Sequence, residues 1–211
     1  MPFGTIAASG WASGLNLYGT ALLLGLIGRL GWAETPPQLQ RTWVLAVLAA
    51  LYALEFVVDK VPWADSTWDA VHTVIRPIGG GVLGALLAHE AGSPELPAAL
   101  AAGGFALTAH GAKASTRAAV NVSPEPVSNL ALSLSEDGIV AVMVALALSH
   151  PLVAGVLAVV FAITSVAVTW ILYRFVKRVR ARLRERKAAR RDGGGPVDGG
   201  GDVVDGGGAA P

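Results

Sequence analysis

The chain has 211 residues, of which 53% are apolar and only 15% are charged, and its mean hydropathy is +0.55. A soluble domain carries about 25% charged residues, so this composition argues against an ordinary soluble enzyme and excludes intrinsic disorder for the body of the chain. The sequence contains no cysteine, which excludes disulfides, thiolate nucleophiles and cysteine-ligated zinc. We therefore expect one membrane domain followed by a tail.

The first apolar stretch, residues 5–28, is interrupted by five small or polar residues, Ser9, Gly10, Ser13, Gly14 and Asn16. It has no basic n-region, so it does not fit a cleaved signal peptide. Small residues three and four apart favour close packing between helices. The alternative is an unwound helix that offers backbone groups to a ligand, with Asn16 and Thr20 beside it.

Four other stretches predict further helices, at residues 43–58, 96–112, 137–149 and 151–176. The surest is residues 151–173, which carry no charge and exceed the length of about 20 residues that a membrane span needs. Ser149, His150 and Pro151 predict a tight turn, so we expect the last two stretches to form a helical hairpin.

Residues 66–90 are harder to assign, because Pro77 and Gly79 to Gly81 break or kink a helix. If this stretch crosses the membrane, the chain has about six spans. If it is a re-entrant hairpin, the chain has five. The predicted fold class is in either case an all-α, polytopic helical membrane bundle with broken helices, which are tolerated where protein or a wet cavity satisfies the freed backbone groups.

The charge is spread unevenly along the chain. Residues 1–173 carry a net charge of −4, residues 174–191 carry +9 and residues 192–211 carry −4. The basic block directly follows the longest apolar run, so it places the C-terminus in the cytoplasm and the protein in the inner (plasma) membrane as a multi-pass protein. The block predicts binding to anionic lipid head groups, and nucleic acid is not an expected partner.

Three parts of the chain follow from these patterns: an integral membrane domain at residues 1–176, a basic juxtamembrane segment at 177–191 and a disordered Gly/Asp-rich tail at 192–211.

Charged residues within spans are costly, so each one calls for a partner or a function. Asp65, Asp69, His72 and Arg76 lie on one face of a helix. They fit a helix cap with interface residues, or a polar stripe that lines a cavity. Asp65, Asp69 and His72 also have the ligand types of a metal site, but no further motif supports one.

His110, Lys113 and Arg117 form a cationic stripe at the end of another predicted span. These side chains either reach to the membrane interface or take part in ion pairs or anion binding. Glu136 and Asp137 are first-turn acids of the next helix or the partners of Lys113 and Arg117.

Glu55 is the best candidate for a buried carboxylate, whereas Asp59 is expected at the water boundary. Residues 121–138 add two more polar candidates. The predicted polar pathway or ion-pair cluster is therefore Glu55, Asp65, Asp69, His72, Arg76, His110, Lys113, Arg117, Glu125, Asn129, Glu136 and Asp137.

Several of these stretches together resemble a known family. They are ASG with SGLNLY at residues 8–18, EFVVDKVPWADSTWD with a following histidine at 55–72, RPIGGG at 76–81, HGAKASTR at 110–117 and NVSPEPVSN with SEDG at 121–138. Over residues 7–175 the chain resembles the bacterial membrane proteins grouped as domain of unknown function family 4126. The resemblance implies an integral membrane protein and carries no activity.

Three functions compete. The first is a small transporter or channel-like protein, for protons or small cations in the first instance, with an anionic solute as the variant that Lys113 and Arg117 favour. The second is a membrane scaffold, as a homo-oligomer or with other partners, and the third is an intramembrane enzyme that acts on lipids. No catalytic residue or cofactor is predicted, because serine-elbow, phosphatidyltransferase and lipid-phosphatase motifs do not occur in the sequence.

Overall fold

The computed structural model describes residues 3–59, 61–120 and 126–192. The chain divides into a first unit, Met1–Val176, and a second unit, Lys177–Pro211, which are treated separately. Within the described ranges the secondary structure is entirely helical. The helices are α1 (Phe3–Leu15), α2 (Leu17–Arg29), α3 (Thr42–Val58), α4 (Pro62–Glu90), α5 (Glu95–Val120), α6 (Pro126–Ser149) and α7 (Pro151–Asp192).

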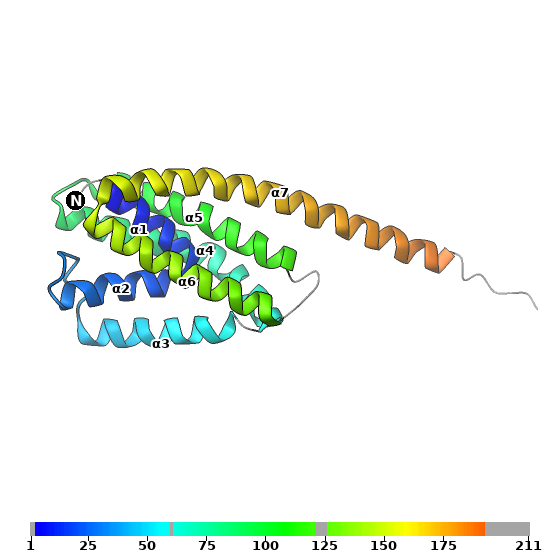
Figure 1. Cartoon of the computed structure of the whole chain (residues 1–211), viewed down its shortest axis with the longest axis horizontal. Helices are drawn as coiled ribbons and strands as arrows, with labels where there is room; N and C mark the ends of the chain where they lie inside the picture. The colour runs from blue at the N-terminus through cyan, green and yellow to red at the C-terminus, as the bar shows by residue number, and fades with distance from the viewer. Residues whose placement is uncertain (1–2, 60, 121–125, 193–211) are drawn as a thin grey trace, which may run out of the picture. The chain divides into compact units, whose positions relative to one another are not determined.

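Helices α1 and α2 form a hairpin that turns back inside the first unit (Figure 1). Ile6, near the start of α1, packs with Leu87 and Ala88 at the end of α4. Gly28, at the end of α2, lines a hollow together with Glu90, so both open ends of the hairpin lie at the same end of the bundle.

The turn of this hairpin is a single residue, Asn16, whose backbone is extended (φ −146°, ψ 100°). Its side chain accepts a hydrogen bond from the Gly19 backbone N–H at 2.7 Å, which caps the first turn of α2. Residues 5–28 therefore form two short helices rather than one continuous helix, and the chain turns back here instead of at residues 66–90. The interruption by polar residues was visible in the sequence, but the direction of α2 depends on packing against α3.

Helix α4 is continuous from Pro62 to Glu90 and contains Pro77 in its interior. The expected break is absent from this helix because its glycines serve close packing instead. A Cβ on Gly80 would lie 2.6 Å from Ser13 Oγ, and one on Gly84 would lie 2.5 Å from the Ala102 side chain. These glycines let α4 approach α1 and α5, as small residues do in membrane bundles.

Helix α1 lies in the centre of the first unit, and all its residues from Gly4 to Leu15 are buried. Gly10 packs against Ala102 of α5 so closely that a Cβ would come within 2.6 Å of the Ala102 Cα atom. On its other sides, Thr5 donates to the Ala147 carbonyl of α6 (2.9 Å) and Trp11 donates to Ser165 of α7 (3.3 Å). The N-terminal helix is thus held by three helices that follow much later in the chain.

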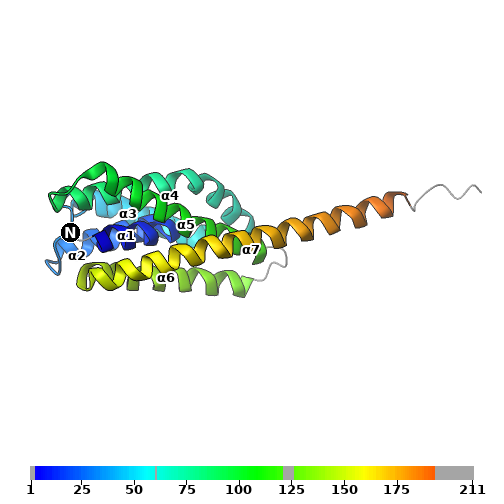
Figure 2. The same ribbon diagram turned by 90° about the horizontal axis from the view of Figure 1, so that it is seen from above.

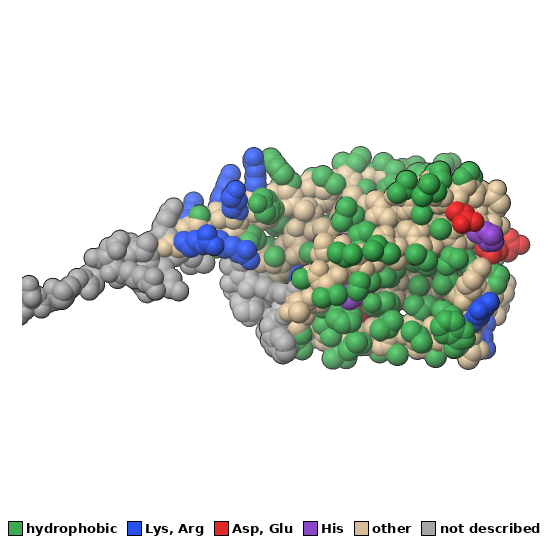
Figure 3. All heavy atoms as spheres, turned by 180° about the vertical axis from the view of Figure 1, so that it is seen from behind, with side chains coloured by type: hydrophobic (Ala, Val, Ile, Leu, Met, Phe, Trp, Pro, Cys, Tyr) green, Lys and Arg blue, Asp and Glu red, His purple; other side chains and the backbone are tan. Residues whose placement is uncertain are grey.

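Helices α3 to α6 and the first part of α7 run alternately between the two ends of the first unit (Figures 1 and 2). Helices α6 and α7 meet at His150, in the hairpin that the sequence predicts. Many large apolar side chains point outward from them, and Figure 3 shows one face of the bundle largely covered by hydrophobic side chains.

Three helical stretches of the described residues are long and apolar enough to cross a membrane, at Thr67–Glu90, Leu130–Ser149 and Pro151–Arg182. Helices α2 and α3 are shorter and also apolar. A bundle whose outside is this apolar, and whose interior holds charges, is that of a membrane protein.

Candidate functional site

A group of buried charged side chains occupies the interior of the first unit, between the tip of the α1–α2 hairpin and helices α3 to α6. Each of these side chains belongs to a residue that is at most 9% exposed. We call this group the charged cluster; it consists of Glu55 and Asp59 on α3 and its C-cap, Asp69 and Arg76 on α4, Lys113 and Arg117 on α5, and Glu136 on α6.

Arg76 forms one half of the charged cluster. Its guanidinium pairs with Glu55 and lies 3.5 Å from the Asp69 carboxylate. It also donates to the backbone carbonyl of Gly14, at the end of α1, at 3.3 Å. Arg76 thus ties α3 and α4 to the hairpin tip, and its carbonyl contact places a cation at the negative end of the α1 dipole.

Lys113 and Arg117 form the other half, one helical turn apart on α5. Both contact the same two carboxylate oxygens, Asp59 Oδ2 and Glu136 Oε2. Lys113 Nζ lies 3.0 Å from each, and Arg117 Nη2 lies 2.9 Å and 2.8 Å away respectively. The positive and negative groups therefore alternate around a ring of four. Lys113 also lies 3.6 Å from Glu55, which links the two halves.

Two histidines border the charged cluster in defined tautomers. Arg76 Nη1 donates to His110 Nδ1 at 2.8 Å, so the His110 ring proton is on Nε2, which lies 3.2 Å from the Asp69 carbonyl. His72 Nδ1 lies 2.8 Å from the Trp68 carbonyl and carries the proton there. Its Nε2 then accepts from the Tyr18 hydroxyl at 3.0 Å. Because its Nδ1 accepts from Arg76, the His110 ring is neutral in this arrangement, and the His72 contacts fit a neutral ring as well.

The hairpin tip contributes its own polar contact beside the charged cluster. The Asn16 amide donates to the Asp137 carboxylate at 3.0 Å, and Tyr52 of α3 hydrogen-bonds the same carboxylate. Asp137 therefore joins α6 to the residue at which the hairpin turns.

Negative groups outnumber positive ones here. With Asp137 included, five carboxylates face three cations, a formal charge of −2 among the described side chains while both histidines are neutral. Neither oxygen of Asp69 has a hydrogen-bond partner, nor does Glu55 Oε2. An uncompensated charge in a buried site is costly, so a further positive charge would lower the free energy of this arrangement.

Nine residues named from the sequence are brought together in this region: Glu55, Asp69, His72, Arg76, His110, Lys113, Arg117, Glu136 and Asp137. Lys113 and Arg117 turn inward to carboxylates instead of reaching the membrane interface. Glu125 lies outside the described residues, as do the side chains of Asp65 and Asn129. The metal site of Asp65, Asp69 and His72 stays a prediction, because the Asp65 side chain is not described. Among the described residues no group of three potential ligands converges.

Sequence reasoning placed Asp59 at the water boundary, whereas its side chain is buried and contacts both Lys113 and Arg117. The sequence signal for the burial of Asp59 was its position four residues after Glu55, which places both carboxylates on the same helix face. Tyr18 and Tyr52 were missed because a tyrosine in an apolar helix gives no sign of which side chain its hydroxyl will meet.

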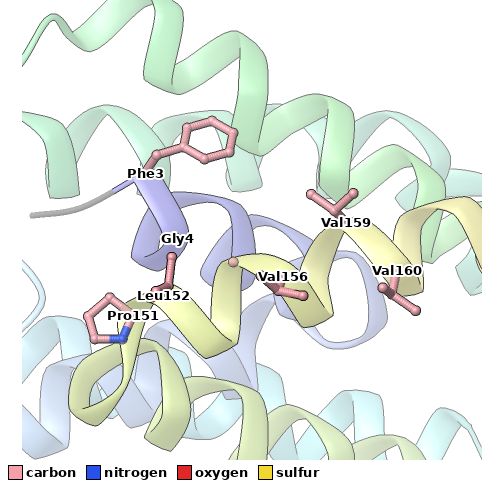
Figure 4. A pocket seen from close by; sticks show the side chains of 8 residues that line it. Phe3, Gly4, Pro151, Leu152, Val156, Val159 and Val160 are labelled. Atoms are coloured by element: carbon pink, nitrogen blue, oxygen red, sulfur yellow. The ribbon is translucent and has the colours of Figure 1, made fainter.

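Two hollows lie apart from the charged cluster. One is an apolar groove of about 650 Å³ between the start of α1 and the start of α7, lined by Phe3, Gly4, Pro151 and valines of α7 (Figure 4). The other, of about 640 Å³, lies at the end of α2 and includes Glu34, Gln40 and Glu90.

A family model described as domain of unknown function, DUF4126, matches residues 4–171. The chain belongs to this family. The matched DUF4126 region contains all seven helices up to the apolar part of α7, and with them the whole charged cluster. Comparison with curated proteins gave no significant match, and neither did comparison with solved structures.

Proposed function

We propose that this protein transports a small cation, with the proton as the first candidate, across a membrane through its charged cluster. The observation that carries the proposal is the excess of buried carboxylates at the tip of a re-entrant helix hairpin. Half-helices that end in the middle of a bundle present backbone groups to ions in many transporters. Here the α1 carbonyls point at the cations of the cluster.

In this proposal Asp69 and Glu55 take up and release the transported cation. Asp69 has two buried oxygens that lack hydrogen-bond partners, and Glu55 has one. Arg76, which contacts both carboxylates, holds them in place and limits their repulsion. His110 lies between Arg76 and Thr73: its Nδ1 accepts from Arg76 Nη1 and its Nε2 is 3.1 Å from the Thr73 hydroxyl, so it helps to position the Arg76 guanidinium beside the two carboxylates.

The basic residues after the apolar part of α7 support an orientation with the C-terminus in the cytoplasm of the inner membrane. In that orientation the charged cluster lies within the membrane. Anionic lipid head groups are the partners that the basic segment favours.

A flux assay tests the proposal. We would reconstitute the full chain in vesicles of phosphatidylcholine and phosphatidylglycerol, impose a potential with potassium and valinomycin, and follow internal pH with a trapped dye. The wild type is expected to carry protons faster than protein-free vesicles. Asp69→Asn and Glu55→Gln should reduce flux to the protein-free rate, while Glu95→Gln, an exposed carboxylate on α5, should leave it unchanged.

A second candidate is a membrane scaffold, and the observation that favours it is that Arg76, Lys113 and Arg117 each contact two or more carboxylates. Such a network also holds a bundle together. If vesicles with the wild-type protein take up protons, sodium and potassium no faster than protein-free vesicles, the transport proposal is wrong and the scaffold proposal is favoured.

Water access separates the two candidates independently of flux. Because the chain has no cysteine, single cysteines can replace Glu55, Asp69, Lys113 or Glu136, with Val160 as the outward-facing apolar control. A membrane-impermeant thiol reagent should label positions 55 and 69 in a transporter. In a scaffold these positions should stay unlabelled from both sides.

A further inference from the structure

The ammonium group of Lys113 is surrounded by oxygens from the end of α1, from α3 with its C-cap and from α6. Its Nζ lies 3.0 Å from the Leu15 carbonyl, 3.0 Å from Asp59 Oδ2 and 3.0 Å from Glu136 Oε2. Glu55 Oε1 follows at 3.6 Å. The ammonium donates hydrogen bonds to Leu15 and Asp59 and forms ion pairs with Glu136 and Glu55, so the cation is well compensated although its side chain is 1% exposed.

The Leu15 carbonyl is available because of the way the hairpin turns. In an unbroken helix it would accept from the N–H of Gly19, four residues on. That N–H is bound instead to the Asn16 side chain, so the carbonyl of Leu15 is left free to face Lys113. The same break frees the Gly14 carbonyl for Arg76. The hairpin tip therefore presents two backbone carbonyl oxygens, those of Gly14 and Leu15, to the cations of the charged cluster.

This set of oxygens has the composition of a site for a monovalent cation. One backbone carbonyl and three carboxylate oxygens replace the hydration shell, as carbonyl rings do for potassium in channels. Magnesium and calcium require oxygens at about 2.0–2.6 Å, much closer than these. A potassium ion and an ammonium group prefer oxygen neighbours at similar distances, so the spacing around Lys113 suits either.

The charge balance favours a cation at this point as well. With Lys113 present, the described carboxylates exceed the cations by two. Without its ammonium the excess over the whole group rises to three, and among the described side chains Asp59, Glu136 and Glu55 keep only Arg117 and Arg76 as cationic partners. A vacated site of this kind would be strongly attractive to a dissolved cation.

We propose that the Leu15 carbonyl and the carboxylates of Asp59, Glu136 and Glu55 form a binding site for a monovalent cation, which the Lys113 ammonium fills in this conformation. When Lys113 withdraws, a dissolved cation takes its place. Lys113 is thus a tethered competitor that keeps the site occupied and the hairpin in position. The binding site stands on its geometry, whereas its use in a transport cycle rests on the function proposed above.

Lys113→Ala, purified in detergent, tests the site. Its melting temperature would be measured in equal concentrations of chloride salts of potassium, sodium, propylammonium, calcium and the bulky cation N-methylglucamine. We expect potassium or propylammonium to raise the melting temperature of Lys113→Ala by roughly 2–4 °C over N-methylglucamine. The wild type should show no difference between these cations, because Lys113 already fills the site.

Two variants control for general effects of salt and of lysine loss. Lys113→Met fills the space without charge and leaves no room for an ion, so it should be destabilised and not rescued. Lys177→Ala removes an exposed lysine from α7 and should behave as the wild type does. A response of Lys113→Ala that equals that of Lys177→Ala, or one to calcium alone, overturns the proposal.

If Lys113→Ala does not fold in any of these salts, Lys113→Ala/Glu136→Gln takes its place. Its formal charge in the cluster equals that of the wild type, and its amide oxygen can still act as a ligand. Selective stabilisation by potassium or propylammonium supports the site and its absence overturns it. These melting curves need no flux, so failure of the site and failure of transport are separate results.

Discussion

Helices α4 and α7 both contain stretches long enough to cross a membrane, yet they differ in how much of their surface the rest of the protein buries. Of the most apolar 18-residue stretch of α4, 39% is buried inside the protein, whereas only 17% of the corresponding stretch of α7 is buried. Helix α4 turns Asp69, His72 and Arg76 into the bundle and packs its glycines on α1 and α5. Helix α7 presents Leu152, Val156 and Ile163 outward.

The difference shows that, of the three stretches long enough to cross a membrane, the most hydrophobic is the least buried by the rest of the protein. Apolar residues on α7 match the lipid, and lipid contact contributes no specificity between helices. The polar and small residues of α4 determine which helices it packs against and how closely it approaches them. Substitutions of the same chemical type should therefore have very different effects on the two helices.

The largest effect is expected for arginine. Arg76→Gln leaves Glu55 buried without its partner and removes a contact of the hairpin tip, which should cost about 3–5 kcal/mol of unfolding free energy. Arg174→Gln removes an exposed guanidinium stacked on Trp170 and should cost about 1 kcal/mol or less. Denaturant unfolding in detergent measures both. Equal losses would contradict the contrast between interior and surface.

Glycine gives the next contrast. A Cβ on Gly14 would overlap the Ala106 carbonyl, so Gly14→Ala should push α1 away from α5 at a cost of about 1–3 kcal/mol. A Cβ on Gly104 meets nothing within 4 Å, and Gly104→Ala should be neutral or stabilise its helix by up to about 1 kcal/mol. Opposite signs in melting temperature are the expected result, and destabilisation by Gly104→Ala would be inconsistent with its outward position.

Tyrosine gives the smallest effect. Tyr18→Phe removes the donor to His72 Nε2 and should cost about 1 kcal/mol, since the ring nitrogen then lacks a partner in a buried site. Tyr173→Phe, on the outside of α7 at 62% exposure, should change stability by less than about 0.5 kcal/mol. Both are measured by the same unfolding titration, and a larger loss at Tyr173 would place that residue in an interface.

Much of the fold could be predicted from the sequence because its signals are local. The apolar runs predict α3, α5 and α7 within a few residues of their starts, and the turn at His150 follows from its neighbours, whereas α6 begins at Pro126, eleven residues before the predicted stretch. The hairpin at Asn16 and the continuity of α4 through Pro77 could not be predicted. In both cases the outcome depends on a partner helix, since the same glycines that weaken a lone helix allow close packing in a bundle.

The charged cluster could be predicted as a set of residues but not as a geometry. A charge in an apolar stretch needs a partner, and this reasoning alone points to Glu55, Asp69, Arg76 and Glu136. It fails for Asp59, because a helix end in the sequence resembles a water boundary even where other helices cover it. It also fails for the Leu15 carbonyl, since a backbone oxygen has no sequence signature until a neighbouring side chain frees it.

The burial of α1 has a consequence for how the protein is made. This helix is synthesised before the helices that hold it, because its contacts Ala102, Ala147 and Ser165 follow about a hundred residues or more later. The close contact between Gly4 and Gly155 adds a further tie to the start of α7. Contacts so distant in sequence form late. Helix α1 therefore reaches its native place only after helices α5 to α7 have been synthesised, although it precedes all of them in the chain.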